Sequence, residues 1–191
     1  MTTTTTIILI VVLVALAAGA YLAVRYRESK RLQSKFGPEY DRTVQEQGSR
    51  LKAENRLGKL EKRVKRYQIR PLLPDERDRF QQTWHVIQLQ FVDDPNTAVN
   101  EADRLISRIM TARGYPVEDF DQCAADISVD HPQVVENYRA GHEIVVRHVK
   151  GQATTEDLRR AMLHYRTLFE DLIEVPMPAY AVAAAASRRS R

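Results

Sequence analysis

Apolar residues run without interruption from Ile7 to Val24, and this is the strongest pattern in the chain. A helix over that run rises about 1.5 Å per residue and spans roughly 27 Å, close to the hydrocarbon thickness of a bilayer. Such a helix satisfies its own backbone hydrogen bonds in lipid. The pattern predicts an N-terminal segment, residues 1–24, with a transmembrane helix that begins at Ile7 and ends at Val24.

Positive charges follow the apolar run and do not precede it. The flank that is rich in Lys and Arg stays in the cytoplasm, so we expect a single-pass protein of the inner membrane with its N-terminus outside and its C-terminal part cytoplasmic. A signal peptide needs basic residues before its apolar run. The small residues at 17–20 still leave cleavage as an alternative. The basic residues after the run, which are also candidates for contact with anionic lipid, are Arg25, Arg27, Lys30, Arg31 and Lys35.

Three small residues in the run, Ala15, Gly19 and Ala23, lie four positions apart on one side of the predicted helix. Stripes of this kind let two membrane helices approach closely. They suggest a homodimer, and a monomeric anchor is at least as good an interpretation.

Residues 25–70 form a basic stem for which the pattern predicts two helices. Pro38 disfavours helical geometry at Gly37, so the helix that continues from the anchor should end there. The second helix should run from Glu39 to about Tyr67. Its apolar residues do not keep one heptad frame long enough to predict a coiled coil.

Beyond the prolines at 71 and 74, apolar residues recur at helical spacing and no segment shows the alternation of a strand. Residues 71–174 therefore predict an all-α bundle, and residues 175–191 a disordered tail. Proline, aspartate, threonine and glycine mark the helix ends. The helices that we expect cover about 74–93, 94–114, 116–127, 132–151 and 154–174, with a stripe of Phe80, Trp84, Ile87 and Phe91 in the first and Val135, Tyr138, His142, Val145 and Val149 in the fourth.

Composition supports this division. The formal net charge of +4 hides a stem of net +9 and a bundle of net −8. A single cysteine, Cys123, excludes an internal disulfide and a cysteine-rich zinc module. The charge layout therefore joins a neutral anchor, a basic stem and an acidic body.

Several short words in the body, FVDDP, EAD, RGYP, DF, AAD and SVDHP, resemble a domain of small bacterial single-pass membrane proteins. The likeness covers roughly residues 72–174. It implies a bacterial source and one helical unit behind a membrane anchor. It brings no activity with it, so no residue role is transferred.

Motifs for catalysis or cofactors are missing from the sequence. His142 and His148 are six positions apart and lie on different sides of a helix, whereas zincins place two histidines four apart. No glycine-rich nucleotide loop or nucleophile elbow is present. Cys123 has the surroundings of an inert buried thiol. We therefore expect no catalytic residue, no metal and no cofactor, and we lean away from an enzyme.

Four residues are candidates for a binding site in the body: Trp84, Tyr138, Arg139 and His142. Trp84 is the only tryptophan, and His142 interrupts an apolar stripe. Placement of Trp84 and His142 in the core is the stronger interpretation of both.

The sequence favours a non-enzymatic, membrane-tethered helical module that binds a partner protein at the cytoplasmic face. An exposed apolar patch on the bundle would support this hypothesis. A ligand-binding or enzymatic bundle with a site between its helices is the alternative, and binding of anionic lipid by the stem is another. Nucleic acid is not expected as a partner, because no helix-turn-helix or aromatic-interleaved pattern accompanies the cations.

Overall fold

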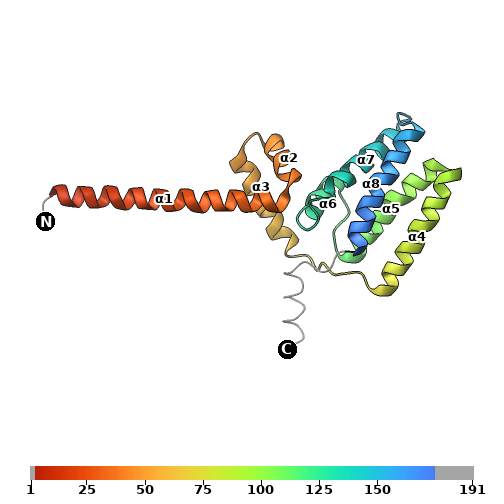
Figure 1. Ribbon diagram of the computed structural model, residues 1–191, viewed down its shortest axis with the longest axis horizontal. Coiled ribbons are helices and arrows are strands. Elements are labelled where there is room, and N and C mark those ends of the chain that lie inside the picture. The colour runs from red at the N-terminus through yellow and green to blue at the C-terminus, as the bar shows by residue number, and fades with distance from the viewer. Residues whose placement is uncertain (1–2, 175–191) are drawn as a thin grey trace, which may run out of the picture. The chain divides into compact units, whose positions relative to one another are not determined.

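A computed structural model describes residues 3–174 of the chain (Figure 1). The described part is all-helical and confirms the predicted fold class. The disordered tail expected over residues 175–191 lies outside the described residues. The helices in the described part are α1 (Thr3–Phe36), α2 (Pro38–Gln47), α3 (Arg50–Val64), α4 (Pro74–Asp93), α5 (Pro95–Arg113), α6 (Phe120–Ile127), α7 (Val135–Val149) and α8 (Thr155–Glu174).

Helix α1 is one continuous helix that holds the apolar run and the first basic residues. Its stretch from Leu9 is long and apolar enough to cross a membrane. The large apolar side chains described there are exposed, as Leu16 is at 69%. As predicted, the helix ends before Pro38, at Gly37, which has a positive φ of 50°.

The stem differs from the prediction of one helix over 39–67. Gly48 adopts the left-handed conformation with φ 62° and ends α2, so α2 and α3 are separate helices. Glycine adopts this conformation without steric strain, which makes it a common helix terminator. The predicted helix over 39–67 took no account of Gly48 as a stop signal.

The described part of the chain divides into two compact units between Leu57 and Gly58, inside α3. We expected a boundary at Arg70–Pro71. The difference arises because residues 58–70 pack with the body: the Arg70 backbone N–H donates to the Arg113 carbonyl at 2.9 Å. Gly114, with φ 95°, lies so close to this segment that a Cβ would be 2.6 Å from the Gln68 carbonyl oxygen.

In the first unit, the end of α1 packs with α2 and α3 around a small core. Its buried apolar residues are Leu32, Phe36, Tyr40, Ala53 and Leu57. Their spacing places each on one side of its helix, so the basic stem is amphipathic and folded.

In the second unit, α5 packs against α4, α7 and α8, and α7 packs along α8 (Figure 1). The predicted caps are present: Asp94 accepts from the Thr97 N–H at 3.1 Å, and Asp157 accepts from the Thr154 N–H at 2.9 Å. Such bonds satisfy backbone donors that a helix start leaves free. The largest fully buried apolar side chains of α5 and α8 are those of Leu105, Ile106, Ile109, Met110, Tyr165 and Leu168.

Three details of the body differ from the sequence expectations. Helix α6 begins at Phe120, where Asp119 caps it, and not at Pro116. Helix α7 begins at Val135, after a turn that contains Pro132. The sequence pattern places Val149 in the inward stripe of that helix, but it is 77% exposed because it lies in the last turn, beyond the packed part of α7.

Candidate functional site

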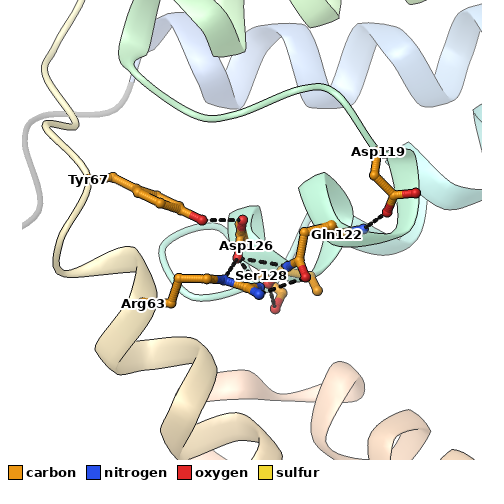
Figure 2. Close-up of polar contacts among 7 residues, drawn as sticks. Arg63, Tyr67, Asp119, Gln122, Asp126 and Ser128 are labelled. Atoms are coloured by element: carbon orange, nitrogen blue, oxygen red, sulfur yellow. Dashed lines mark hydrogen bonds and ion pairs between the residues drawn. The ribbon is translucent and has the colours of Figure 1, made fainter.

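The most tightly bound polar group in the body is the carboxylate of Asp126 on α6, which is fully buried (Figure 2). Arg63, near the end of α3, donates to its Oδ1 from Nε at 3.0 Å and from Nη2. The Tyr67 hydroxyl donates to Oδ2 at 2.9 Å. Gln122, one turn before Asp126, donates to Oδ1 at 3.1 Å and accepts from Arg63 at 2.6 Å.

The electrostatics of this cluster reflect a compromise between burial and pairing. Burial raises the pKa of Asp126 above its ordinary value, although the bonds from Tyr67 and Arg63 oppose that shift. Burial, together with the bond to Asp126, also raises the pKa of Tyr67. Each strong donor already has an acceptor, so the cluster fastens residues 58–70 to α6 and leaves no group poised for chemistry.

This cluster has only a weak signal in the sequence. Asp126 resembles the many aspartates that cap helices, and Arg63 lies in a run of cations that is typical of a solvated face. The available signal is position: Asp126 is on the same side of α6 as Cys123 and Ile127, which are buried. A carboxylate on an apolar face needs a buried partner.

The structure separates Trp84 from the other predicted binding residues. Trp84 is 6% exposed and stacks on Phe169 of α8, with ring centroids 4.8 Å apart. This is a core contact between α4 and α8. A surface role for the whole indole is not compatible with that burial.

Tyr138 and His142 lie against Phe120 at the start of α6, and Arg139 Nη1 lies 3.4 Å from Asp121 Oδ1 of the same helix. The rings of Tyr138 and His142 lie 4.7 and 3.6 Å from that of Phe120. His142 Nδ1 is 3.5 Å from Asp103 Oδ1 of α5. Burial raises the pKa of Tyr138 well above its ordinary value. These contacts describe a packed junction, and the three residues line neither the groove between α4 and α8 nor the cleft between α4 and α5.

A shallow groove lies between α4 and α8, and a row of exposed apolar side chains runs along the solvent side of α4. Its volume is about 170 Å³, and its lining residues are Trp84, Gln88, Phe91, Arg159, Met162, Leu163 and Arg166. The row on α4 consists of Val86, Leu89 and Val92, which are 60%, 60% and 80% exposed. Helix α4 is therefore apolar on two sides, of which one packs on the body and the other faces solvent.

A second cavity, of about 280 Å³, is the cleft between α4 and α5. Its lining residues are Glu76, Arg79, Phe80, Thr83, Leu105 and Arg108. Glu76 is held by two bonds of 2.7 Å from Arg70, which lower its pKa to about 2. This cleft is more polar than the α4–α8 groove.

Within residues 3–174, no group of three His, Cys, Asp or Glu side chains is arranged to hold a metal ion. Cys123 is buried, and burial raises the pKa of its thiol to about 11. A thiol with that pKa is protonated and unreactive at neutral pH.

The candidate lipid-binding cations are engaged to different degrees. Arg25 Nη2 lies 3.5 Å from Glu54 on α3, and Arg31 binds Glu28 at 2.7 Å. Lys30 and Lys35 lie over the rings of Tyr26 and Phe36. Arg27 is exposed. Contact of these residues with lipid stays a prediction.

Similarity to known proteins adds no residue roles. The resemblance carried by the words FVDDP and SVDHP brings no activity with it, so the role of each residue rests on the geometry of the described part of the chain. Comparison of the chain with protein-family models, curated proteins and solved structures found no match.

Proposed function

We propose that the chain is a membrane-tethered, non-enzymatic helical module that binds an amphipathic helix of a partner protein in the groove between α4 and α8. The observation that carries this proposal is the apolar lining of that groove, together with the exposed row of Val86, Leu89 and Val92 on the solvent side of the same helix α4. Exposed apolar surface of this kind marks interaction sites in proteins that otherwise cover their apolar residues.

The shape and chemistry of the groove favour a helix as its occupant. Two packed helices form its walls, and its lining is mainly apolar, with Phe91 and Leu163 accessible from outside. A helix docks in such a groove through apolar residues at i, i+3, i+4 and i+7. Arg159 and Arg166 stand two turns apart on α8 at the edge of the groove. They donate to Glu156 and Glu170 of the same helix, so carboxylates of the partner helix would share these arginines with exposed glutamates.

The anchor defines where this binding takes place. The apolar stretch of α1 supports a single-pass protein, and the basic residues that follow it support an N-terminus outside and a cytoplasmic body in a bacterial inner membrane. Tethering confines the body to the membrane surface, which raises its effective concentration toward partners in the same membrane.

Site-specific photo-crosslinking of the full-length chain in membranes of its source tests the proposal. The crosslinking residue replaces Val92, and the captured peptide is identified by mass spectrometry. We expect one protein to be captured through a segment with an amphipathic helical pattern. Leu163→Asp should reduce the yield at least tenfold, because a charge enters the apolar lining of the groove.

Val149→Asp is the matched control, because Val149 is an exposed apolar residue on α7 that does not line the groove. It should leave the yield unchanged, and both variants should keep the melting temperature. Equal capture with Leu163→Asp would contradict the proposal. Capture of lipid alone, or of a second copy of this chain, would contradict the proposed occupant.

A further inference from the structure

The cleft between α4 and α5 is separate from the groove between α4 and α8, and no residue lines both. Arg79, Phe80 and Thr83 reach it from the first half of α4, and Leu105 and Arg108 reach it from α5. Its volume of about 280 Å³ is at the lower end of the range for sites that hold small molecules. It is large enough for one ring and its substituent.

Two guanidinium groups determine the charge of this cleft. Arg79 donates from Nε to the Asp75 backbone carbonyl at 3.1 Å, which does not neutralise its charge. Arg108 Nη2 lies 3.5 Å from Glu101 Oε2, while the other oxygen of Glu101 accepts a 2.8 Å bond from Arg104. Arg108 therefore shares one carboxylate with a closer arginine.

The one carboxylate in the lining does not cancel these charges. Both oxygens of Glu76 accept 2.7 Å bonds from Arg70, and Oε2 also accepts from the Leu73 backbone N–H at 2.9 Å. Glu76 thus forms a neutral pair with an arginine outside the lining. The cleft has a positive lining, although residues 71–174 together carry a net charge of −8.

Beside the guanidinium groups, the cleft offers apolar surface. The Phe80 ring is half-buried, and Leu105 is 1% exposed beneath the opening. Arginine binds carboxylates and phosphates through paired N–H donors, and an aromatic or aliphatic group gains by covering apolar surface.

We propose that the cleft between α4 and α5 binds a small organic anion, with a carboxylate or phosphate monoester on Arg79 and Arg108 and an apolar or aromatic group on Phe80 and Leu105. This site goes beyond the proposed partner-binding function, because it takes a different class of ligand on different residues. A soluble metabolite-sized anion and the head of a phosphate-monoester lipid share this chemistry.

Calorimetric titration of the full-length chain in nonionic detergent micelles tests the site with phenyl phosphate and benzoate. Micelles without protein provide the blank. We expect one binding site for each compound. Inorganic phosphate and benzyl alcohol should bind at least tenfold more weakly, since the first lacks the aromatic ring and the second lacks the anionic group. Affinity should fall as salt is raised.

Variants assign the binding to this cleft. Arg79→Gln and Arg108→Gln should each weaken binding of phenyl phosphate at least fivefold, because each removes a charged donor. Arg77→Gln is the matched control: Arg77 is an exposed arginine of α4 that does not line the cleft. It should bind phenyl phosphate as the natural chain does.

Absence of binding, or equal binding by Arg79→Gln and Arg108→Gln, would overturn the proposal. Binding of inorganic phosphate as tightly as phenyl phosphate would overturn the role of Phe80 and Leu105. Short-chain phosphatidic acid added to the same micelles distinguishes the sources. Displacement of phenyl phosphate by this lipid supports a lipid head as the ligand, and undiminished binding supports a soluble anion.

Discussion

Two buried carboxylates, Glu54 in the first unit and Asp126 in the second, are bound in similar ways. The Tyr40 hydroxyl donates to Glu54 at 3.1 Å, and Arg25 lies 3.5 Å from its other oxygen. Asp126 has a tyrosine and an arginine too, but its arginine uses two nitrogens, and Gln122 adds a further bond. Arg25 and Arg63 are exposed to a similar degree, so exposure does not distinguish the two clusters. The clusters differ in the donors around the carboxylate, which are fewer and more distant at Glu54 than at Asp126.

This difference shows that the basic segment serves two folded units. Arg25 belongs to a small helical unit that follows the anchor, and Arg63 belongs to the body. Cations that look alike in sequence therefore have different surroundings. A run of Lys and Arg near a membrane anchor is not by itself a solvated or lipid-facing surface.

Removal of residues 58–71 should produce the largest effect on the body. A fragment of residues 72–174 loses Arg63 and Tyr67, which leaves Asp126 buried without its charge partner, and it also loses the buried side chains of Val64 and Ile69. Each apolar side chain contributes about 1.5–3 kcal/mol, in a body whose total stability is about 5–15 kcal/mol. We expect residues 58–174 to unfold cooperatively on heating and residues 72–174 to lack a sharp transition in circular dichroism. Equal melting of both fragments would restore the boundary at Pro71.

Trp84→Ala should destabilise the body by about 3–5 kcal/mol, because it removes a buried indole and its stacking contact with Phe169. Leu89→Ala on the exposed side of α4 is the matched control and should change stability by less than about 0.5 kcal/mol. Urea unfolding followed by circular dichroism measures both. A small effect of Trp84→Ala would mean that the indole is not part of the core.

Most of the fold could be predicted because its signals are local. Pro74, Pro95 and Gly114 mark helix ends, and the apolar spacing gives the buried side of each helix. The boundary at Leu57–Gly58 could not be predicted in this way, because it depends on contacts between residues about sixty positions apart, such as Arg63 with Asp126. Of the predicted site residues, Tyr138, Arg139 and His142 lie together and Trp84 does not, since helical spacing shows which side of a helix a residue occupies but not which helix faces it.

Arg63→Gln and Arg25→Gln compare the two carboxylate clusters directly. Arg63→Gln should cost on the order of 3 kcal/mol, because it leaves Asp126 buried with a weaker donor. The loss of stability caused by Arg63→Gln should be smaller in a chain that also carries Asp126→Asn, because no buried carboxylate is then left without its arginine. Arg25→Gln should cost less than about 1 kcal/mol, because its single contact with Glu54 is long and partly exposed. Equal costs, measured by urea unfolding of the full-length chain, would show that the two clusters are equivalent.

The smallest expected effect is a pH dependence of opposite sign at two carboxylates of the body. The pKa of Asp126 is raised, so its contribution to stability is present at low pH and is lost as pH rises through that raised pKa. The pKa of Glu76 is lowered to about 2, so its contribution is present above 4.5 and is lost as pH falls toward 2. Unfolding followed by Trp84 fluorescence, with Asp126→Asn and Glu76→Gln as references, measures both. If the contributions of Asp126 and Glu76 to stability changed with pH in the same direction, the different surroundings of the two carboxylates would be contradicted.

Hydrogen exchange of the full-length chain tests the division inside α3 most directly. The amides of residues 62–67 belong to the second unit, and those of residues 54–57 belong to the first. We expect Trp84→Ala, which weakens the body, to speed exchange at residues 62–67 together with α5 and α8, while residues 54–57 keep the protection of the natural chain. Exchange that stays unchanged at residues 62–67, or that rises equally at residues 54–57, would contradict the division of the basic segment between two units.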